Sequence, residues 1–160
     1  MILFLDFDGV LHPDPCFDEA RLFEQAPRLA RAVEPFPEVA VVLSTSWRTL
    51  RTLAELVAPL PSSLRERVID VTPPLSLEGT PASLVPYRRQ AECMQWLRAS
   101  GEEHRPWLAL DDRASLFAPY CRQLILCESP QGLTEETATR LTSLLCRARQ
   151  KSMQHVDALL

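Results

Sequence analysis

Hydrophobic residues along this chain gather in short runs separated by longer stretches in which they recur with helical spacing. Four runs carry no charged residue, at residues 2–5, 39–43, 107–110 and 123–127, and a fifth at residues 68–71 contains one aspartate. Short apolar runs of this kind are typical of strands that are buried on both faces, as in the centre of a parallel sheet. The sequence therefore predicts five strands.

The stretches between these runs predict helices. The helices are expected to begin near Pro27, Ser46, Arg88 and Thr134. A proline in the first turn, a serine cap and a threonine followed by two glutamates are all typical of helix starts. The helix that starts at the Ser46 cap is predicted to be continuous, with an apolar side formed by Leu50, Leu53, Ala54 and Val57.

The order of these elements predicts the fold. Strands that alternate with helices indicate an α/β protein, here a three-layer α/β/α Rossmann-like fold with a central parallel sheet. A length of 160 residues is that of about one domain, and no repeat or shift in composition divides the chain. We expect a single domain over residues 1–150 and a C-terminal tail over residues 151–160.

Pairs of polar residues directly follow three of the predicted strands. The pairs are Asp6 and Asp8, Ser44 and Thr45, and Asp111 and Asp112. Because right-handed crossovers bring the carboxyl ends of parallel strands to one edge, we expect the three pairs to meet there, where open sheets bind ligands. Two carboxylates as close as Asp6 and Asp8 repel each other unless one is protonated or a cation such as Mg²⁺ lies with them. The alternative is that these aspartates only form a turn or cap a helix.

Composition narrows the functional classes. The net charge of −4 gives no overall basic character of the kind that favours nonspecific binding to nucleic acid. The five cysteines form no C-x-x-C pair and no spacing that suggests a zinc site. Neither a signal peptide nor an apolar segment of membrane-spanning length is predicted, so we expect a cytoplasmic protein that does not bind membranes.

Three segments of the chain resemble motifs of a known superfamily. The segments are Leu-Asp-Phe-Asp-Gly-Val-Leu at residues 5–11, Val-Leu-Ser-Thr-Ser-Trp-Arg at residues 42–48 and Leu-Ala-Leu-Asp-Asp-Arg at residues 108–113. They resemble motifs I, II and IV of the haloacid dehalogenase-like (HAD) superfamily, and the similarity extends over about residues 1–127. It points to the small bacterial and phage members that have a minimal cap or no cap.

The resemblance implies a Mg²⁺-dependent phosphohydrolase. Asp6 would be the nucleophile that forms an aspartyl-phosphate, and Asp8 would be the general acid and then the general base. Mg²⁺ would be bound by the Asp6 carboxylate, the Asp8 backbone carbonyl and an acid of motif IV. Asp111 is expected to bind Mg²⁺ directly, and Asp112 is expected to lie next to the ligands without binding the ion. The reverse assignment stays open.

The resemblance also implies groups that bind the phosphoryl oxygens. Thr45 is expected to supply the hydroxyl of motif II, with Ser44 as the alternative. Motif III usually carries a lysine, and this chain departs from it, because the candidates are Arg88 and Arg89, of which Arg89 has the better register. Further substrate contacts are expected from Ser46, Arg48 and Arg113. The alternative for the motif III candidates is an exposed arginine at a helix start, and for Arg48 and Arg113 it is an exposed salt bridge. His12 is expected to be a loop residue at the surface or the entrance.

The expected partner is a phosphorylated substrate. The segments after motif I and before motif III are too short for a large cap, and an open site suits an exposed or bulky phosphomonoester, either a small molecule or a nucleic-acid phosphate end. The Pro-rich residues 72–87 are predicted to form a loop, either at the rim of the site or elsewhere on the surface. The sequence gives no indication of oligomeric state.

Two other functions fit parts of the pattern. One is a catalytically weak HAD-fold protein that acts as a binding or regulatory module, although both Asp6 and Asp8 are present. The other is a phosphoacceptor receiver domain, which also has a parallel sheet and clustered acids. Receivers carry a lysine at the last strand, whereas Glu128 follows the last strand here.

Overall fold

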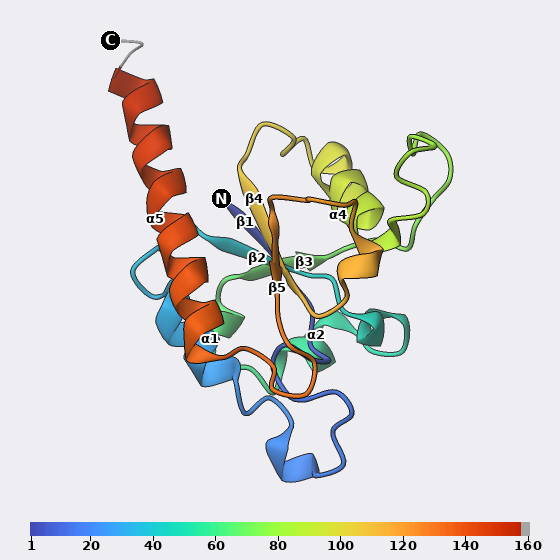
Figure 1. Cartoon of the computed structure of the whole chain (residues 1–160), viewed down its shortest axis with the longest axis vertical. Helices are drawn as coiled ribbons and strands as arrows, with labels where there is room; N and C mark the ends of the chain where they lie inside the picture. The colour runs from blue at the N-terminus through green and yellow to red at the C-terminus, as the bar shows by residue number, and fades with distance from the viewer. Residues whose placement is uncertain (158–160) are drawn as a thin grey trace.

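The computed structural model describes residues 1–157. A five-stranded sheet in the order β3-β2-β1-β4-β5 forms its centre, and every neighbouring pair of strands is parallel (Figure 1). The strands are β1 (Ile2–Leu5), β2 (Ala40–Leu43), β3 (Val68–Val71), β4 (Trp107–Asp111) and β5 (Leu124–Leu126). The predicted strands and the parallel sheet are confirmed.

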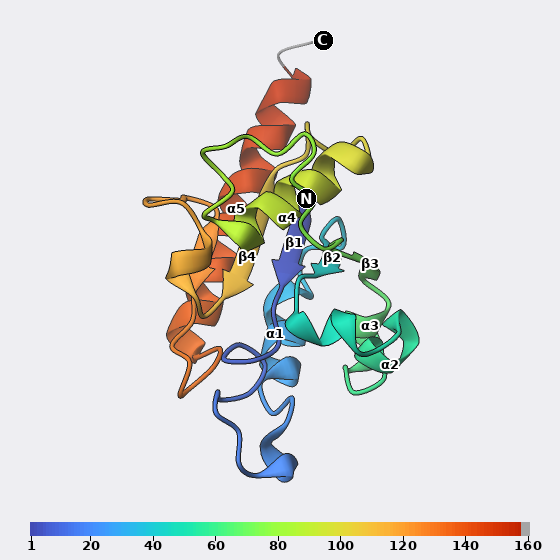
Figure 2. The ribbon, with the colours of Figure 1, turned by 90° about the vertical axis from the view of Figure 1, so that its right-hand side faces the viewer.

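Helices cover both faces of the sheet. They are α1 (Ala26–Val33), α2 (Leu53–Val57), α3 (Ser62–Arg65), α4 (Arg88–Ala99) and α5 (Glu135–Asp157), with the short 3-10 helices η1 (Glu19–Arg21), η2 (Ser46–Thr49) and η3 (Ala114–Leu116). Helices α1 and α5 pack together on one face, and α4 lies on the other (Figures 1 and 2). This is the three-layer α/β/α Rossmann-like arrangement that the sequence predicted.

Strand β1 lies in the middle of the hydrophobic core. Its four residues are fully buried, and their side chains alternate between the two faces of the sheet. Leu3 and Leu5 join the apolar cluster that contains α1 and α5, whereas Ile2 and Phe4 join the cluster around Trp96 of α4. Each buried side chain of this size contributes about 1.5–3 kcal/mol to folding. The core therefore holds β1, and the residues that follow it, firmly in place.

The predicted helix from Ser46 is wrong in its extent. The chain first forms η2, which is capped by Thr45 and not by Ser46 as predicted, and then starts again as α2, which is capped by Thr52. Thr52 and Glu55 form a capping box, in which each side chain bonds to the backbone N–H of the other residue, and this fixes the second start. Leu50, which the periodicity assigned to the apolar side, is 89% exposed. The short helix α3 was not predicted.

The C-terminal helix is longer than predicted. Helix α5 runs to Asp157, so residues 151–157 of the predicted tail are helical, and residues 158–160 lie outside the described residues. The last turns of α5 extend beyond the body of the protein (Figure 1). None of the described helices is both long enough and apolar enough to cross a membrane.

The two segments that could have carried a cap are loops. Residues 12–25 contain only η1, and residues 72–87 contain neither a helix nor a strand. The Ser76 N–H donates to the Gln95 side chain at 3.0 Å, and Arg98 donates to the Gly79 carbonyl at 2.7 Å. These bonds place the middle of the second loop against the C-terminal half of α4. No cap domain is present within residues 1–157, as predicted.

Candidate active site

The strand register aligns the predicted polar residues at the carboxyl end of the sheet. Leu5 at the end of β1 pairs with Leu43, the last residue of β2, on one side and with Leu110 of β4 on the other. Asp6, Ser44 and Asp111 each directly follow one of these three leucines. The N–H of Ser44 donates to the Leu5 carbonyl at 2.8 Å, and the N–H of Asp6 donates to the Leu110 carbonyl at 3.1 Å. The three residues therefore lie side by side at the carboxyl end of the sheet.

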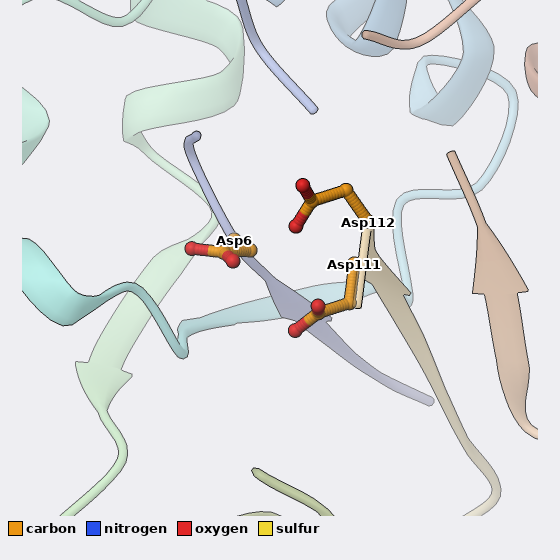
Figure 3. A group of neighbouring side chains, drawn as sticks. All are labelled: Asp6, Asp111 and Asp112. Atoms are coloured by element: carbon orange, nitrogen blue, oxygen red, sulfur yellow. The ribbon is translucent and has the colours of Figure 1, made fainter. Parts of the chain in front are cut away.

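An acidic cluster forms at this end of the sheet from Asp6, Asp111 and Asp112. Each carboxylate offers an oxygen atom within 4.8 Å of the others, at the carboxyl ends of β1 and β4 (Figure 3). Asp6 and Asp111 are buried. The Nη1 atom of Arg89, at the start of α4, lies 3.0 Å from an oxygen of Asp6 and 3.0 Å from an oxygen of Asp111. The single positive charge of Arg89 thus lies between two of the three carboxylates.

Burial dominates the electrostatics of the acidic cluster. It raises the pKa of Asp6 above its ordinary value, against the opposing effects of Arg89 and of a hydrogen bond from the Phe7 N–H. It also raises the pKa of Asp111, to about 7, again against Arg89. Neighbouring buried carboxylates are easier to ionise when a cation binds between them. The acidic cluster therefore has the charge and the oxygen atoms that suit a divalent cation.

Asp112 differs from Asp111 in its hydrogen bonds. Both Asp111 oxygens are engaged, one by the Arg113 N–H at 2.9 Å and the other by Arg89 at 3.0 Å. The Asp112 Oδ1 atom is buried and has no hydrogen-bond partner within residues 1–157. Gly9 packs against the same carboxylate, because a Cβ at Gly9 would lie 2.4 Å from Asp112 Oδ2. The same Oδ1 atom lies 4.0 Å from Arg113 Nε, so Asp112 has a buried oxygen with an ionic neighbour but no hydrogen bond.

Asp8 lies outside the acidic cluster. Its carboxylate accepts hydrogen bonds from Trp47 Nε1 at 2.9 and 3.1 Å, and it lies 3.1 Å from His12 Nε2. The hydrogen bond with His12 lowers the pKa of Asp8, burial opposes this, and the hydrogen bond from Trp47 lowers the pKa further. Asp6 and Asp8 therefore have pKa values that shift in opposite directions. Opposite shifts of two neighbouring acids are typical of residues with different catalytic roles.

The predicted hydroxyl groups lie where β2 ends. Ser44 and Thr45 are buried, and the Thr45 Oγ1 atom accepts a hydrogen bond from the Trp47 N–H at 3.3 Å as the cap of η2. Ser46 is exposed. The structure thus brings Ser44 and Thr45 to the carboxyl end of the sheet, beside Asp6.

A pocket of about 260 Å³ opens next to the acidic cluster. Its lining includes Arg48, Arg88, Arg89 and Arg113 together with Glu92, and we call it the arginine pocket. Glu92 pairs with Arg48 at 2.6 Å and with Arg88 at 3.2 Å. Of the two candidates for motif III, Arg89 reaches the acidic cluster, whereas Arg88 is paired with Glu92. Ser46 lines the arginine pocket as well.

Comparison with protein families identifies the family of the chain. A family model described as the HAD domain in Swiss Army Knife RNA repair proteins matches residues 2–138. The chain belongs to this HAD family. The match includes every residue of the acidic cluster and of the arginine pocket, and it confirms the resemblance seen in the motifs. A search of curated proteins found no match to the chain.

Part of this candidate site was not predicted from the sequence. Trp47 was given no role, although its place two residues after Thr45 puts it within one short turn of the strand end. Glu92 could have been noticed as the i+4 partner of Arg88, but its bond to Arg48 depends on how α4 packs beside η2. His12, expected at the surface or the entrance, is 1% exposed.

Proposed function

We propose that this HAD domain is a Mg²⁺-dependent phosphohydrolase that cleaves phosphomonoesters through an aspartyl-phosphate intermediate. The observation that carries the proposal is the acidic cluster, in which three carboxylates from two neighbouring strand ends converge and Arg89 bridges the two that are buried. Membership of the HAD superfamily supports hydrolase chemistry in general. The individual roles are inferred from the surroundings of each side chain.

Asp6 is suited to be the nucleophile. One of its oxygens accepts the Phe7 N–H at 2.8 Å, and the other lies 3.0 Å from Arg89 Nη1, so the carboxylate is fixed in orientation. Attack by an Asp6 oxygen on phosphorus forms the acyl phosphate as the bond from phosphorus to the leaving oxygen breaks. Arg89 is placed to bind a phosphoryl oxygen at the same time, and the Thr45 or Ser44 hydroxyl is proposed to bind another.

Asp8 is suited to be the general acid and base. Its carboxylate is held by Trp47 and His12 rather than by an arginine. A phosphate dianion bound at Asp6 raises the pKa of Asp8, because a nearby negative charge disfavours ionisation. Asp8 then gives its proton to the leaving oxygen. As a carboxylate, it takes a proton from the water that hydrolyses the acyl phosphate.

The acidic cluster fits Mg²⁺, which prefers oxygen ligands. We assign Asp6 and Asp112 as the carboxylate ligands, because Asp112 Oδ1 is buried without a hydrogen-bond partner in the described part of the chain. Asp111 would instead position Arg89, which exchanges the roles expected from the sequence for the two motif IV acids. The Asp8 backbone carbonyl remains a proposed ligand. When bound, Mg²⁺ offsets the repulsion between the Asp6 carboxylate and the phosphate.

The proposed substrate presents an accessible phosphate. No cap within residues 1–157 closes over the site, so a bulky phosphomonoester can approach it. The description of the matching family names RNA repair, which supports a nucleic-acid phosphate end over a small molecule. The net charge of −4 favours recognition of such an end rather than extended binding along a strand.

Hydrolysis of p-nitrophenyl phosphate tests the proposal. We expect turnover by the wild type that requires Mg²⁺, no turnover by Asp6→Asn, and normal turnover by Asp18→Asn, which changes an exposed aspartate outside the site. Equal turnover by wild type and Asp6→Asn would refute the role of Asp6. No turnover on a panel of phosphoesters, with binding retained, would favour the alternative of a catalytically weak binding module.

A further inference from the structure

The arginine pocket is separate from the acidic cluster. None of the aspartates discussed above lines it. Arg89 belongs to both regions, because its Nη1 atom contacts Asp6 and Asp111 while the residue also forms part of the pocket lining. The guanidinium group of Arg89 therefore connects the arginine pocket to Asp6, the proposed nucleophile.

The arginine pocket is built around a buried carboxylate. The Glu92 side chain is 1% exposed and lies 2.6 Å from Arg48 and 3.2 Å from Arg88. It is the one acid among the residues that line the pocket. One carboxylate offsets the charge of only one of these two arginines, so the pair and Glu92 together remain positively charged.

Arg113 adds a further positive charge to the arginine pocket. Its ionic contacts are long, at 3.8 Å to Asp14 and 4.0 Å to Asp112, and its side chain is 60% exposed. Arg89 adds no excess charge, because two carboxylates of the acidic cluster already face it. The pocket thus has an excess of positive charge that an anion would balance.

Arg48 has the properties of a fixed anion-binding group. Its side chain is 8% exposed, its Nη1 atom donates to the Thr45 carbonyl at 2.8 Å, and its Nη2 atom contacts Glu92. The Nε atom is buried and has no hydrogen-bond partner among residues 1–157. A buried N–H donor without an acceptor is unfavourable. An oxyanion beside Arg48 is the kind of acceptor that this donor lacks.

We propose that the arginine pocket binds a second phosphate of the substrate while Asp6 attacks the first. Arginines bind phosphate through paired charged hydrogen bonds, and Ser46, which also lines the pocket, adds a hydroxyl group. The inference rests on the proposed function, because it supposes that the reacting phosphate lies at Asp6. The second phosphate is either a phosphodiester of a nucleic-acid strand or a second monoester of a small bisphosphate, which share the same chemistry.

Calorimetric titration of the full-length Asp6→Asn protein tests the inference without turnover. The probes are a nucleoside 5′-monophosphate, a 3′-monophosphate, a 3′,5′-bisphosphate and a dinucleotide with one terminal phosphate. We expect a probe with two phosphates to bind at least about tenfold more tightly than both monophosphates, the gain expected from one charge-assisted contact. A gain with the dinucleotide identifies a phosphodiester, and a gain with the bisphosphate alone identifies a small bisphosphate. Equal affinities for all four probes would overturn the inference.

Two exposed arginines allow the gain to be assigned to the pocket. Arg88→Ala combined with Arg113→Ala is expected to abolish the gain, whereas Arg122→Ala, at the opposite end of the sheet, retains it. A gain that survives the double substitution would overturn the inference. The wild type in EDTA provides a second sample in case Asp6→Asn folds poorly.

The two proposals can fail separately. Turnover of p-nitrophenyl phosphate by the wild type, combined with equal affinities for the four probes, would overturn the arginine pocket alone. A gain that depends on the pocket, combined with no turnover, would overturn the phosphohydrolase and leave a site for two phosphates.

Discussion

The acidic cluster and the arginine pocket lie next to each other, but they are built differently. The acidic cluster consists of residues at the carboxyl ends of β1 and β4, so strand register places them. The arginine pocket draws its residues from η2, from α4 and from the segment after β4, and Glu92 connects two of its arginines. Arg89 is the residue that they share.

The two regions carry excess charge of opposite sign. The acidic cluster has an excess of negative charge, and burial raises the pKa of Asp6 and of Asp111. The arginine pocket has an excess of positive charge, and a buried Arg48 N–H there has no partner within the described residues. A cation in the first region and an anion in the second would balance both. A substrate with two phosphates that binds together with Mg²⁺ meets this requirement.

Among substitutions that leave both regions intact, the largest effect is expected from Asp8→Asn, which removes the proposed acid and base. We expect kcat to fall by about 10²–10⁴-fold, the usual contribution of general acid–base catalysis. Steady-state kinetics on p-nitrophenyl phosphate measures the loss. An unchanged kcat would show that the leaving oxygen obtains its proton from another group.

Glu92→Ala is expected to break the arginine pocket. It leaves the buried Arg48 without its carboxylate partner, and the free energy of unfolding should fall by about 3–5 kcal/mol. Urea denaturation measures the change. The control is Glu103→Ala, which removes an exposed pair with Arg98 at 3.6 Å and should cost less than about 1 kcal/mol. Equal losses in the two variants would show that Glu92 does not organise the pocket.

The acidic cluster should make the metal-free protein less stable as pH rises. The pKa of Asp111 is raised to about 7 in the folded protein, so between about pH 4 and pH 7 the folded state holds more protons than the unfolded state. The stabilisation is complete below the unfolded pKa and is lost as pH rises through the folded pKa. The loss is at most about 4 kcal/mol, since one pKa unit corresponds to about 1.4 kcal/mol.

Urea denaturation of the protein in EDTA at several pH values measures this trend. Asp111→Asn should give a flatter dependence on pH, and Mg²⁺ should restore stability near pH 7. A wild-type protein that becomes more stable from pH 4 to pH 7, in parallel with Asp111→Asn, would contradict the raised pKa.

The smallest effect is expected from Trp47→Phe, which keeps an aromatic ring but removes the N–H that donates to Asp8. Loss of this hydrogen bond raises the pKa of Asp8, and the alkaline limb of the profile of kcat/KM against pH should move upward. The fall in kcat should be about 2- to 10-fold, the equivalent of one hydrogen bond. Phe23→Leu removes a ring that packs edge-on against Trp47, 5.6 Å away between ring centroids, but it removes no donor to Asp8 and should leave the limb in place.

The acidic cluster could be predicted from the sequence because its position depends on local order. An apolar run followed by Asp6, and another followed by Asp111, become neighbours as soon as the strands are parallel and in register. The same argument placed Ser44 beside them. The hydrogen bonds that distinguish Asp111 from Asp112 depend on where Arg89 and the Arg113 N–H lie, and no pattern in the sequence reports this.

The arginine pocket could be predicted only in part. Arg48, Arg88 and Arg113 were recognised as candidate substrate contacts, but their grouping depends on the packing of η2 against the start of α4. The break between η2 and α2 was missed because the periodicity of Leu50, Leu53 and Val57 suits one continuous helix. The capping box at Thr52 outweighs that periodicity.

The central claim is that Asp6 carries the phosphoryl group during turnover. Full-length protein that turns over a phosphomonoester with Mg²⁺ can be quenched in acid, digested and analysed by mass spectrometry. We predict one phosphoryl group on the peptide that contains Asp6, and none on the same peptide of Asp6→Asn. Rapid turnover by the wild type with no phosphoryl group on that peptide, together with turnover by Asp6→Asn at the same rate, would contradict the claim.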